Sequence, residues 1–126
     1  MIQMGTYLNV VDNSGAKKVM CLKLNRGGYK QCFAYPGSII LVSIKKIKFS
    51  NSLKVKKGEI HKALIIRTKN KIKNLSYNYK KYFENSVILL NKNNKLLGTR
   101  VFGLIPKFFK YSKFLKIITL SAGVSL

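Results

Sequence analysis

Residues 8–24, LNVVDNSGAKKVMCLKL, decide the fold that the sequence predicts, because two short apolar runs flank a polar turn. In the second run, KKVMCLKL, successive side chains point to opposite faces if the segment is a pleated strand. Strict alternation then places Met20, Leu22 and Leu24 on one apolar face. The intervening DNSG, residues 12–15, has side chains that bond the local backbone and a glycine that allows reversal. The stretch therefore predicts a β-hairpin.

Three further runs, at residues 38–48, 59–69 and 86–91, have the length and composition of strands. Each is apolar over most of its length, and the first two end in lysine or arginine. Glycine-marked turns separate the runs, and no long helical pattern lies between them. The five runs predict a mainly β fold, a small five-stranded antiparallel barrel over about residues 1–103.

The end of the chain, about residues 104–126, is expected to form short C-terminal helices. Pro106 suits the first turn of a helix. Apolar side chains then recur every three or four residues along one helical face, at Phe108, Tyr111, Leu115 and Ile118. At 126 residues, barrel and helices are expected to form one domain spanning residues 1–126.

The charge of the chain requires a polyanionic partner. Lys and Arg number 25 against three acids, which gives a formal net charge of +22. Lysines are spread over strands and loops and do not border one apolar helix, so nucleic acid is favoured over a membrane surface. No stretch approaches the roughly 20 apolar residues of a spanning helix.

Lysine dominates this charge, since only three of the 25 basic residues are arginines. Lysine meets phosphate as a mobile point charge, whereas arginine forks read base edges, so folded RNA suits this surface better than sequence-specific DNA. Basic clusters recur where strands leave the core. The predicted RNA-binding residues are Lys17, Lys18, Lys23, Lys45, Lys46, Lys48, Lys54, Lys56, Lys57, Arg67, Lys69, Lys71 and Lys73.

The sequence offers little for catalysis or for a cofactor. Cys21, Cys32 and the single histidine, His61, are too few for a four-ligand zinc site of Cys and His alone. Two free thiols are the default expectation, and a disulfide between them stays open. Glu59 and His61 share a strand face and leave a small basic ribonuclease as one possible function, beside a cationic RNA-binding protein without catalysis. We expect no enzyme, no metal and no cofactor.

Six stretches together resemble one family in order and spacing: VDNSGAKKVMCLKL, PGSIILVSIKK, VKKGEIHKALIIRTK, NSVILLN, LLGTRVFG and KFLKIITL. The family is that of the universal large-subunit ribosomal protein numbered fourteen in the standard series, of bacterial and organellar type. The resemblance implies a five-stranded barrel with short C-terminal helices, bound to large-subunit ribosomal RNA near the face that meets the small subunit.

The resemblance also implies partners. Family members contact neighbouring ribosomal proteins and, across an intersubunit bridge, the small-subunit RNA, and anti-association factors dock on the same side. The positions that match this docking surface are Thr99, Arg100 and Lys116. An alternative for Arg100 is a pair with Glu84 or with RNA of its own subunit.

The chain departs from the family around a projecting ribbon at residues 70–83. Relatives carry an Asp-Gly turn followed by Phe-Asp-Gly-Asn, where this chain has Ser76-Tyr77 and then Tyr82-Phe83-Glu84-Asn85. The turn glycine is missing. We expect the ribbon to differ in conformation or to depend on a local partner.

The compartment is inferred from compositional bias. Lys, Asn, Ile, Tyr and Phe are abundant and Trp is absent, as expected of an AT-rich genome. The first residues do not resemble a secretory signal or a transit peptide. We expect a protein encoded and made inside an organelle, a mitochondrion in preference to a plastid or a bacterium with a similar bias.

Overall fold

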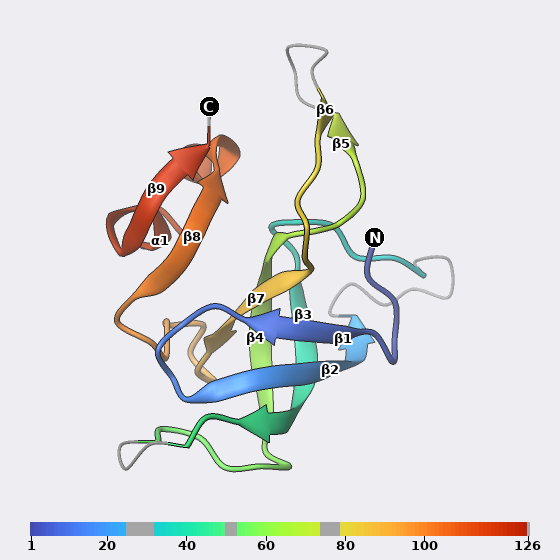
Figure 1. Cartoon of the computed structure of the whole chain (residues 1–126), viewed down its shortest axis with the longest axis vertical. Coiled ribbons are helices and arrows are strands. Elements are labelled where there is room, and N and C mark those ends of the chain that lie inside the picture. Colours follow the sequence, from blue (N-terminus) through green and yellow to red (C-terminus); the bar gives the residue numbers. More distant parts are fainter. Residues whose placement is uncertain (25–31, 50–52, 74–78, 126) are drawn as a thin grey trace.

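The computed structural model describes residues 1–24, 32–49, 53–73 and 79–125. Five strands form a closed barrel in the order β1-β2-β3-β4-β7 (Figure 1). Their bounds are β1 Tyr7–Val10, β2 Ala16–Leu24, β3 Ile39–Ile47, β4 Ile60–Arg67 and β7 Ser86–Leu90. The predicted mainly β fold with a five-stranded barrel is confirmed, and the strand bounds lie close to the predicted runs.

One of the five pairings in the barrel is parallel. β1 pairs with β7 in parallel, with Asn9 opposite Ser86 and Val10 opposite Val87, and the other four pairings are antiparallel. A closed ring with an odd number of strands cannot alternate in direction all the way round, so at least one neighbouring pair must run the same way. The expectation of an antiparallel barrel therefore holds for every pair except the one that closes it.

The interior of the barrel explains why β2 carries both apolar and basic residues. Val19, Cys21 and Leu24 are buried in the barrel core, whereas Met20 and Leu22 are only half-buried. The expected strict alternation is therefore wrong. The β2–β3 pairing has register irregularities on both sides of Lys18 and again after Cys21, and each shifts which side chain faces inward.

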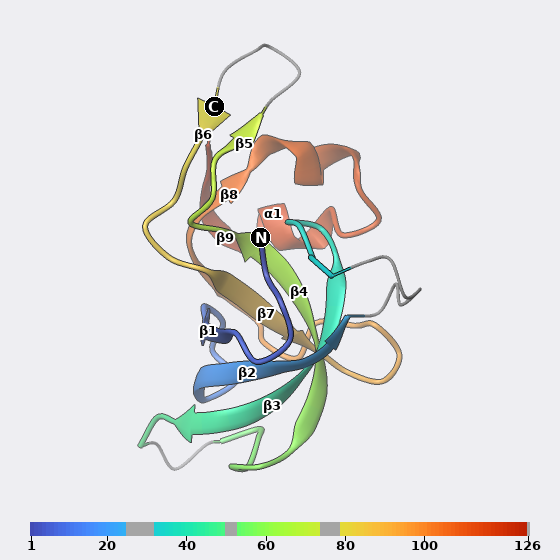
Figure 2. The same cartoon turned by 90° about the vertical axis from the view of Figure 1, so that its right-hand side faces the viewer.

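A second core lies outside the barrel, between it and the end of the chain. β7 and the second half of β4, from Ala63 on, are buried on both faces, because strand β8 Val101–Pro106 and the C-terminal helices pack over their outer side (Figure 2). The buried side chains of this second core are Val11, Leu64, Ile66, Ile88, Leu90, Val101, Ile105, Phe109 and Ile117. Strand β9 Ser121–Ser125 lies beside β8. β8 and β9 pair in parallel, which the sequence did not predict.

The C-terminal helices are shorter than the predicted helical pattern. A 3₁₀ helix, η1, spans Lys107–Tyr111, and an α-helix, α1, spans Lys116–Thr119. Ser112 separates them, because its hydroxyl donates to the Phe109 carbonyl at 2.9 Å and accepts from the Phe114 N–H at 3.2 Å. The predicted apolar face is therefore wrong. Its members Phe108, Tyr111 and Leu115 are exposed, while Phe109 and Ile117 are the buried side chains.

The projecting ribbon forms from two short strands. β5 Ile72–Lys73 and β6 Tyr79–Lys80 pair antiparallel and extend beyond the barrel (Figure 1). The Ser76-Tyr77 turn lies outside the described residues. In β6, Lys80 Nζ donates to Ser125 Oγ at 3.2 Å, which joins the ribbon to the end of β9.

Candidate nucleic-acid interface

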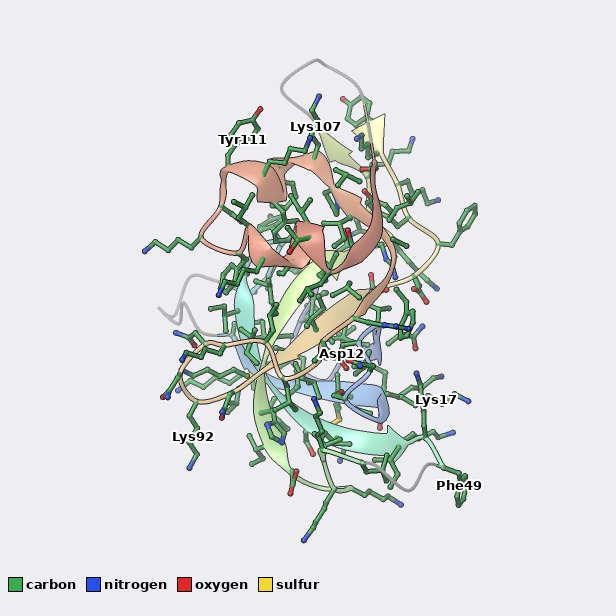
Figure 3. The ribbon with its side chains drawn as sticks, turned by 90° about the vertical axis from the view of Figure 1, so that its left-hand side faces the viewer. Asp12, Lys17, Phe49, Lys92, Lys107 and Tyr111 are labelled. Atoms are coloured by element: carbon green, nitrogen blue, oxygen red, sulfur yellow. The ribbon has the colours of Figure 1, made fainter. Side chains whose placement is uncertain are left out.

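An open groove of about 900 Å³ lies where β2 begins and β3 ends. Lys17 belongs to β2, residues 45–47 to the end of β3, and the other lining residues to the connection that follows. Figure 3 shows Lys17 and Phe49 extending from the same side of the barrel. The lining residues are Lys17, Lys45, Lys46, Ile47, Lys48, Phe49, Leu53 and Lys57. We call this the lysine groove.

Lys46 of the groove faces Lys18, which lies beside the groove, across the sheet. Lys18 and Lys46 are cross-strand partners in the β2–β3 pairing, and both side chains are exposed. Like charges directly opposite one another destabilise a sheet. An anion placed between the two ammonium groups would remove this repulsion.

The acidic residues do not neutralise this groove. Asp12 is buried at the β1–β2 turn, where its carboxylate accepts hydrogen bonds from the backbone N–H and hydroxyl of Ser14 and, at 2.9 Å, from the N–H of Leu89. Each donor belongs to the folded backbone or to its turn. Asp12 therefore ties the hairpin to β7.

Arg67 is buried, although its place at the basic end of a strand predicted RNA contact. Its Nη2 lies 2.8 Å from Glu84 Oε1, and Nη1 donates to the carbonyls of Phe102 at 3.3 Å and Leu104 at 3.2 Å. These contacts attach β8 to the barrel. A Cβ at Gly103 would collide with Arg67 Nη1, so the residue between the two carbonyls must be glycine. The guanidinium is thus occupied by the protein itself and is unsuited to phosphate contact.

Glu59 and His61, the suggested ribonuclease pair, are within hydrogen-bonding distance. His61 Nε2 lies 3.1 Å from Glu59 Oε2, which also accepts from the Lys56 N–H at 3.0 Å. The backbone hydrogen bond from Lys56, followed by the contact with His61, lowers the pKa of Glu59 from its usual value. A carboxyl with a lowered pKa is ionised at neutral pH and is a weak base. In the described chain no cluster of three or more His, Cys, Asp or Glu that could hold a metal is found.

The predicted lysines fall into separate groups. Lys45 is half-buried, and the side chain of Lys73 lies outside the described part. Lys69 and Lys71 are near the ribbon, and Lys23 lies at the far end of β2 from the groove. The exposed members are Lys17, Lys18, Lys23, Lys46, Lys48, Lys54, Lys56, Lys57, Lys69 and Lys71. The lysine groove thus brings together five predicted residues.

Two of these exposed lysines also contact the protein. Lys48 Nζ lies 5.5 Å from the centroid of the Phe102 ring, and Lys54 Nζ donates to the Leu97 carbonyl at 3.2 Å. Sequence reasoning missed Phe49. The signal that could have found it is an aromatic residue directly after a basic strand end.

The turn before β8 presents two of the predicted docking residues. Thr99 and Arg100 are exposed, and both backbone N–H groups donate to Asn13 Oδ1, at 2.7 and 3.1 Å. A Cβ on Gly98 would come within 2.8 Å of Asn13 Oδ1 and 2.9 Å of Asp12 Cβ, so only glycine allows this close approach. Asn13 was not predicted to position this turn.

Lys116 is exposed as the first residue of α1. Its carbonyl accepts from the Leu120 N–H at 3.3 Å, and the Leu120 carbonyl accepts from the Val101 N–H at 3.0 Å. α1 is thus connected to the strand that follows Arg100. The alternative pairing of Arg100 with Glu84 is not observed, because Glu84 pairs with Arg67.

The state of the cysteines and the length of the helices also bear on the possible functions of the chain. Cys21 is buried and Cys32 is exposed, and both thiols are free. Burial raises the pKa of the Cys21 thiol, which keeps it protonated at neutral pH. None of the helices in the described part of the chain is long and apolar enough to cross a lipid bilayer.

Comparison with known proteins identifies the family of the chain. The sequence model of one family, described as Ribosomal protein L14p/L23e, matches residues 1–125. A relative named large ribosomal subunit protein uL14, from Carsonella ruddii (strain PV), is 48% identical over 121 residues, which cover 96% of this chain and 97% of that relative. The match therefore extends over the barrel, the ribbon and the C-terminal strands. This chain belongs to the ribosomal protein L14p/L23e family.

Proposed function

We propose that the chain is a structural constituent of the large ribosomal subunit and binds large-subunit ribosomal RNA. The family match over residues 1–125 carries this proposal, together with the relative named as a large-subunit protein. As a ribosomal protein of this family, the chain has a structural role and is not an enzyme. The ribonuclease alternative has no comparable support.

The lysine groove and its neighbours are proposed to hold the RNA. Five lysines line the groove, and Lys18, Lys54 and Lys56 lie on the same strands and connection. Lysine neutralises phosphates without reading sequence, which suits an RNA whose fold is set by its own pairing. Lys69, Lys71 and Lys73 form a second proposed contact at the ribbon, and Lys23 a third.

The turn at Thr99 and Arg100 is proposed to face the small subunit, together with Lys116. These positions match the docking surface of the resembling family, and the exposure of all three side chains supports the assignment. Small-subunit ribosomal RNA across a bridge and an anti-association factor are the proposed partners there. Neighbouring large-subunit proteins are further proposed partners.

We propose a mitochondrion as the compartment, with a plastid or a bacterial cytoplasm as the alternatives. The Lys- and Asn-rich composition without Trp supports an AT-rich genome, which all three can have. The bacterial relative supports the bacterial alternative. Detection of the chain in ribosomes of purified mitochondria from the source organism would support the mitochondrion, and its detection only in plastid or bacterial ribosomes would contradict it.

Sedimentation of a lysate through a density gradient tests the function. The chain should comigrate stoichiometrically with large ribosomal subunits and stay there after washing at moderate salt. A chain that remains at the top of the gradient would contradict the proposal. For the ribonuclease alternative, purified protein should leave RNA intact at every pH and with every metal, and cleavage lost in His61→Ala would favour it.

A further inference from the structure

Phe49 is the most exposed large apolar side chain of the described protein, at 109% of its reference area. It follows the end of β3 and lines the lysine groove, on the side of the barrel that also carries Lys17 (Figure 3). When another apolar surface covers an aromatic ring that is exposed to water, the free energy falls. The position of Phe49 in the groove therefore implies a partner that covers the ring.

The rest of the groove defines the chemistry of that partner. The described residues that line it include five lysines and no acid, and Ile47 and Leu53 add apolar surface. A partner that fits must present negative charges and a flat apolar face within one groove. Nucleotides combine these features, since phosphates meet lysines and bases stack on aromatic rings. A protein partner would need a cluster of acids beside an exposed apolar side chain.

We infer that the lysine groove binds an unpaired nucleotide of RNA, with its base stacked on Phe49 and its flanking phosphates between the lysines. In a continuous duplex, neighbouring base pairs cover both faces of each base, so a protein ring can stack only on a nucleotide in a bulge, loop or end. The inference rests on the proposed RNA-binding function and specifies the kind of RNA element bound.

Two short RNA hairpins test the inference with the full-length protein. One carries a single-adenine bulge in its stem, and the other is identical but fully paired. Wild type should bind the bulged hairpin more tightly. Phe49→Ala should weaken binding to the bulged hairpin roughly 5- to 150-fold, the range for loss of one stacked base, and should change binding to the paired hairpin little.

A fluorescent variant reports stacking directly. The chain contains no tryptophan, so Phe49→Trp introduces a single indole in the groove. Its emission should be quenched by the bulged hairpin and much less by the paired hairpin at equal saturation. Poly-glutamate at the same charge concentration serves as the probe for an acidic protein partner, and it should not quench.

Phe83 supplies the matched control. It is 98% exposed and does not line the groove, so Phe83→Ala removes a similar area of aromatic surface elsewhere. This variant should bind both hairpins as wild type does. Circular dichroism should confirm that all variants are folded, because neither ring is packed in a core.

Several results would overturn the inference. Equal affinity of wild type and Phe49→Ala for the bulged hairpin would show that no base stacks there, and so would equal losses in Phe49→Ala and Phe83→Ala. Quenching of Trp at position 49 by poly-glutamate but not by RNA would assign the groove to a protein partner. Failure of wild type to bind either hairpin at low salt would also contradict the proposed RNA-binding function. If only the stacking inference is wrong, wild type should instead still bind both hairpins.

Discussion

Asn13 and Thr99, 86 residues apart in the sequence, form two reciprocal hydrogen bonds of 2.7 Å. Asn13 Nδ2 donates to Thr99 Oγ1, and the Thr99 N–H donates to Asn13 Oδ1. Asn13 lies in the β1–β2 turn, so it holds the exposed turn before β8 against the barrel. The position of Thr99 and Arg100 thus depends on a side chain from the opposite end of the sequence.

Asn13→Ala should lower the free energy of unfolding by about 1–2 kcal/mol. It removes three hydrogen bonds, each worth about 0.5–1.5 kcal/mol at best and less when exposed to water. Asn13→Asp keeps the oxygen that accepts from the Thr99 and Arg100 N–H groups and should lose less than half as much. Urea denaturation of the three proteins measures this, and equal midpoints for wild type and Asn13→Ala would contradict the role of Asn13.

Arg67→Met should destabilise the fold by about 2–4 kcal/mol. It leaves the Phe102 and Leu104 carbonyls without their donor and Glu84 without its cation. The matched control is Arg100→Met, because the Arg100 side chain is exposed and its loss should stay within about 0.5 kcal/mol. Denaturation midpoints compare the two. Similar losses in both variants would refute a structural role specific to Arg67.

Glu84 should make the fold sensitive to acid. Partial burial raises the pKa of the Glu84 carboxyl, but hydrogen bonds from Asn9 and Ser86 and the charge of Arg67 outweigh burial and lower the pKa below the usual 4.5. A lowered carboxyl pKa contributes stability above the unfolded value, and this stability is lost as pH falls through the folded pKa. The stability advantage of wild type over Glu84→Gln should therefore shrink as pH falls below 4.5.

Urea midpoints measured for both proteins through the acid range test this prediction. Glu59 also has a lowered pKa, so both proteins should share a part of the acid loss that does not involve Glu84. A difference between wild type and Glu84→Gln that stays constant with pH would count against the assignment.

Neutralising the lysine groove should reduce the salt dependence of RNA binding. The triple variant Lys45→Gln, Lys46→Gln and Lys57→Gln should lower the slope of log affinity against log salt by about 2–3, since each phosphate contact contributes roughly 0.7–0.9. Binding of a large-subunit ribosomal RNA fragment in increasing KCl measures the slope.

The control for this prediction removes the same charge elsewhere. Lys92, Lys95 and Lys113 are exposed and do not line the groove, and Figure 3 shows Lys92 on the other side of the barrel from Lys17. Their replacement by Gln should change the slope by less than about 1. Equal effects of the two triple variants would mean that the whole surface, and not the groove, holds the RNA.

Reversing charge at the proposed docking residues should separate assembly from subunit joining. Arg100→Glu with Lys116→Glu should still enter large subunits, because neither side chain lines the groove. Joining to small subunits or binding of an anti-association factor should weaken at least roughly 30-fold, since reversal at a desolvated polar contact costs about 2 kcal/mol or more.

Gradient profiles of ribosomes carrying this variant give the measurement. Lys110→Glu with Lys113→Glu, in the same C-terminal segment, is the charge-matched control and should join normally. A double variant that is missing from large subunits altogether would instead make Arg100 and Lys116 part of the RNA-anchoring surface.

The barrel strands were predictable because burial imposes a local pattern on them. The apolar runs at residues 38–48, 59–69 and 86–91 contain β3, β4 and β7. The sequence did not reveal which side chains of β2 point into the barrel, because the bulges of β2 depend on its pairing with β3 and are not marked in the sequence. Each lysine of the groove was predicted to bind RNA, but only the folded structure shows that these lysines line one groove.

In the C-terminal segment, the spacing of apolar residues in the sequence did not predict which side chains are buried. Phe108 and Phe109 are adjacent and chemically identical, yet only Phe109 is buried, because the outer faces of β4 and β7 determine which ring packs. For the same reason the sequence placed Arg67 on the surface. Only the folded chain brings Glu84 and the β8 carbonyls to its guanidinium.

The parallel pairing of β1 with β7 determines when the chain can finish folding during its synthesis. The hydrogen bond from the Leu89 N–H to Asp12 joins residues 77 apart, and closing a loop of that length costs about 4 kcal/mol of chain entropy before any constant term. At roughly 5–20 residues per second, synthesis of β7 is completed about 3–13 seconds after that of the hairpin. For that interval the new chain exposes an unpaired edge of β1 and its most basic strands, close to the RNA of the ribosome that is making it.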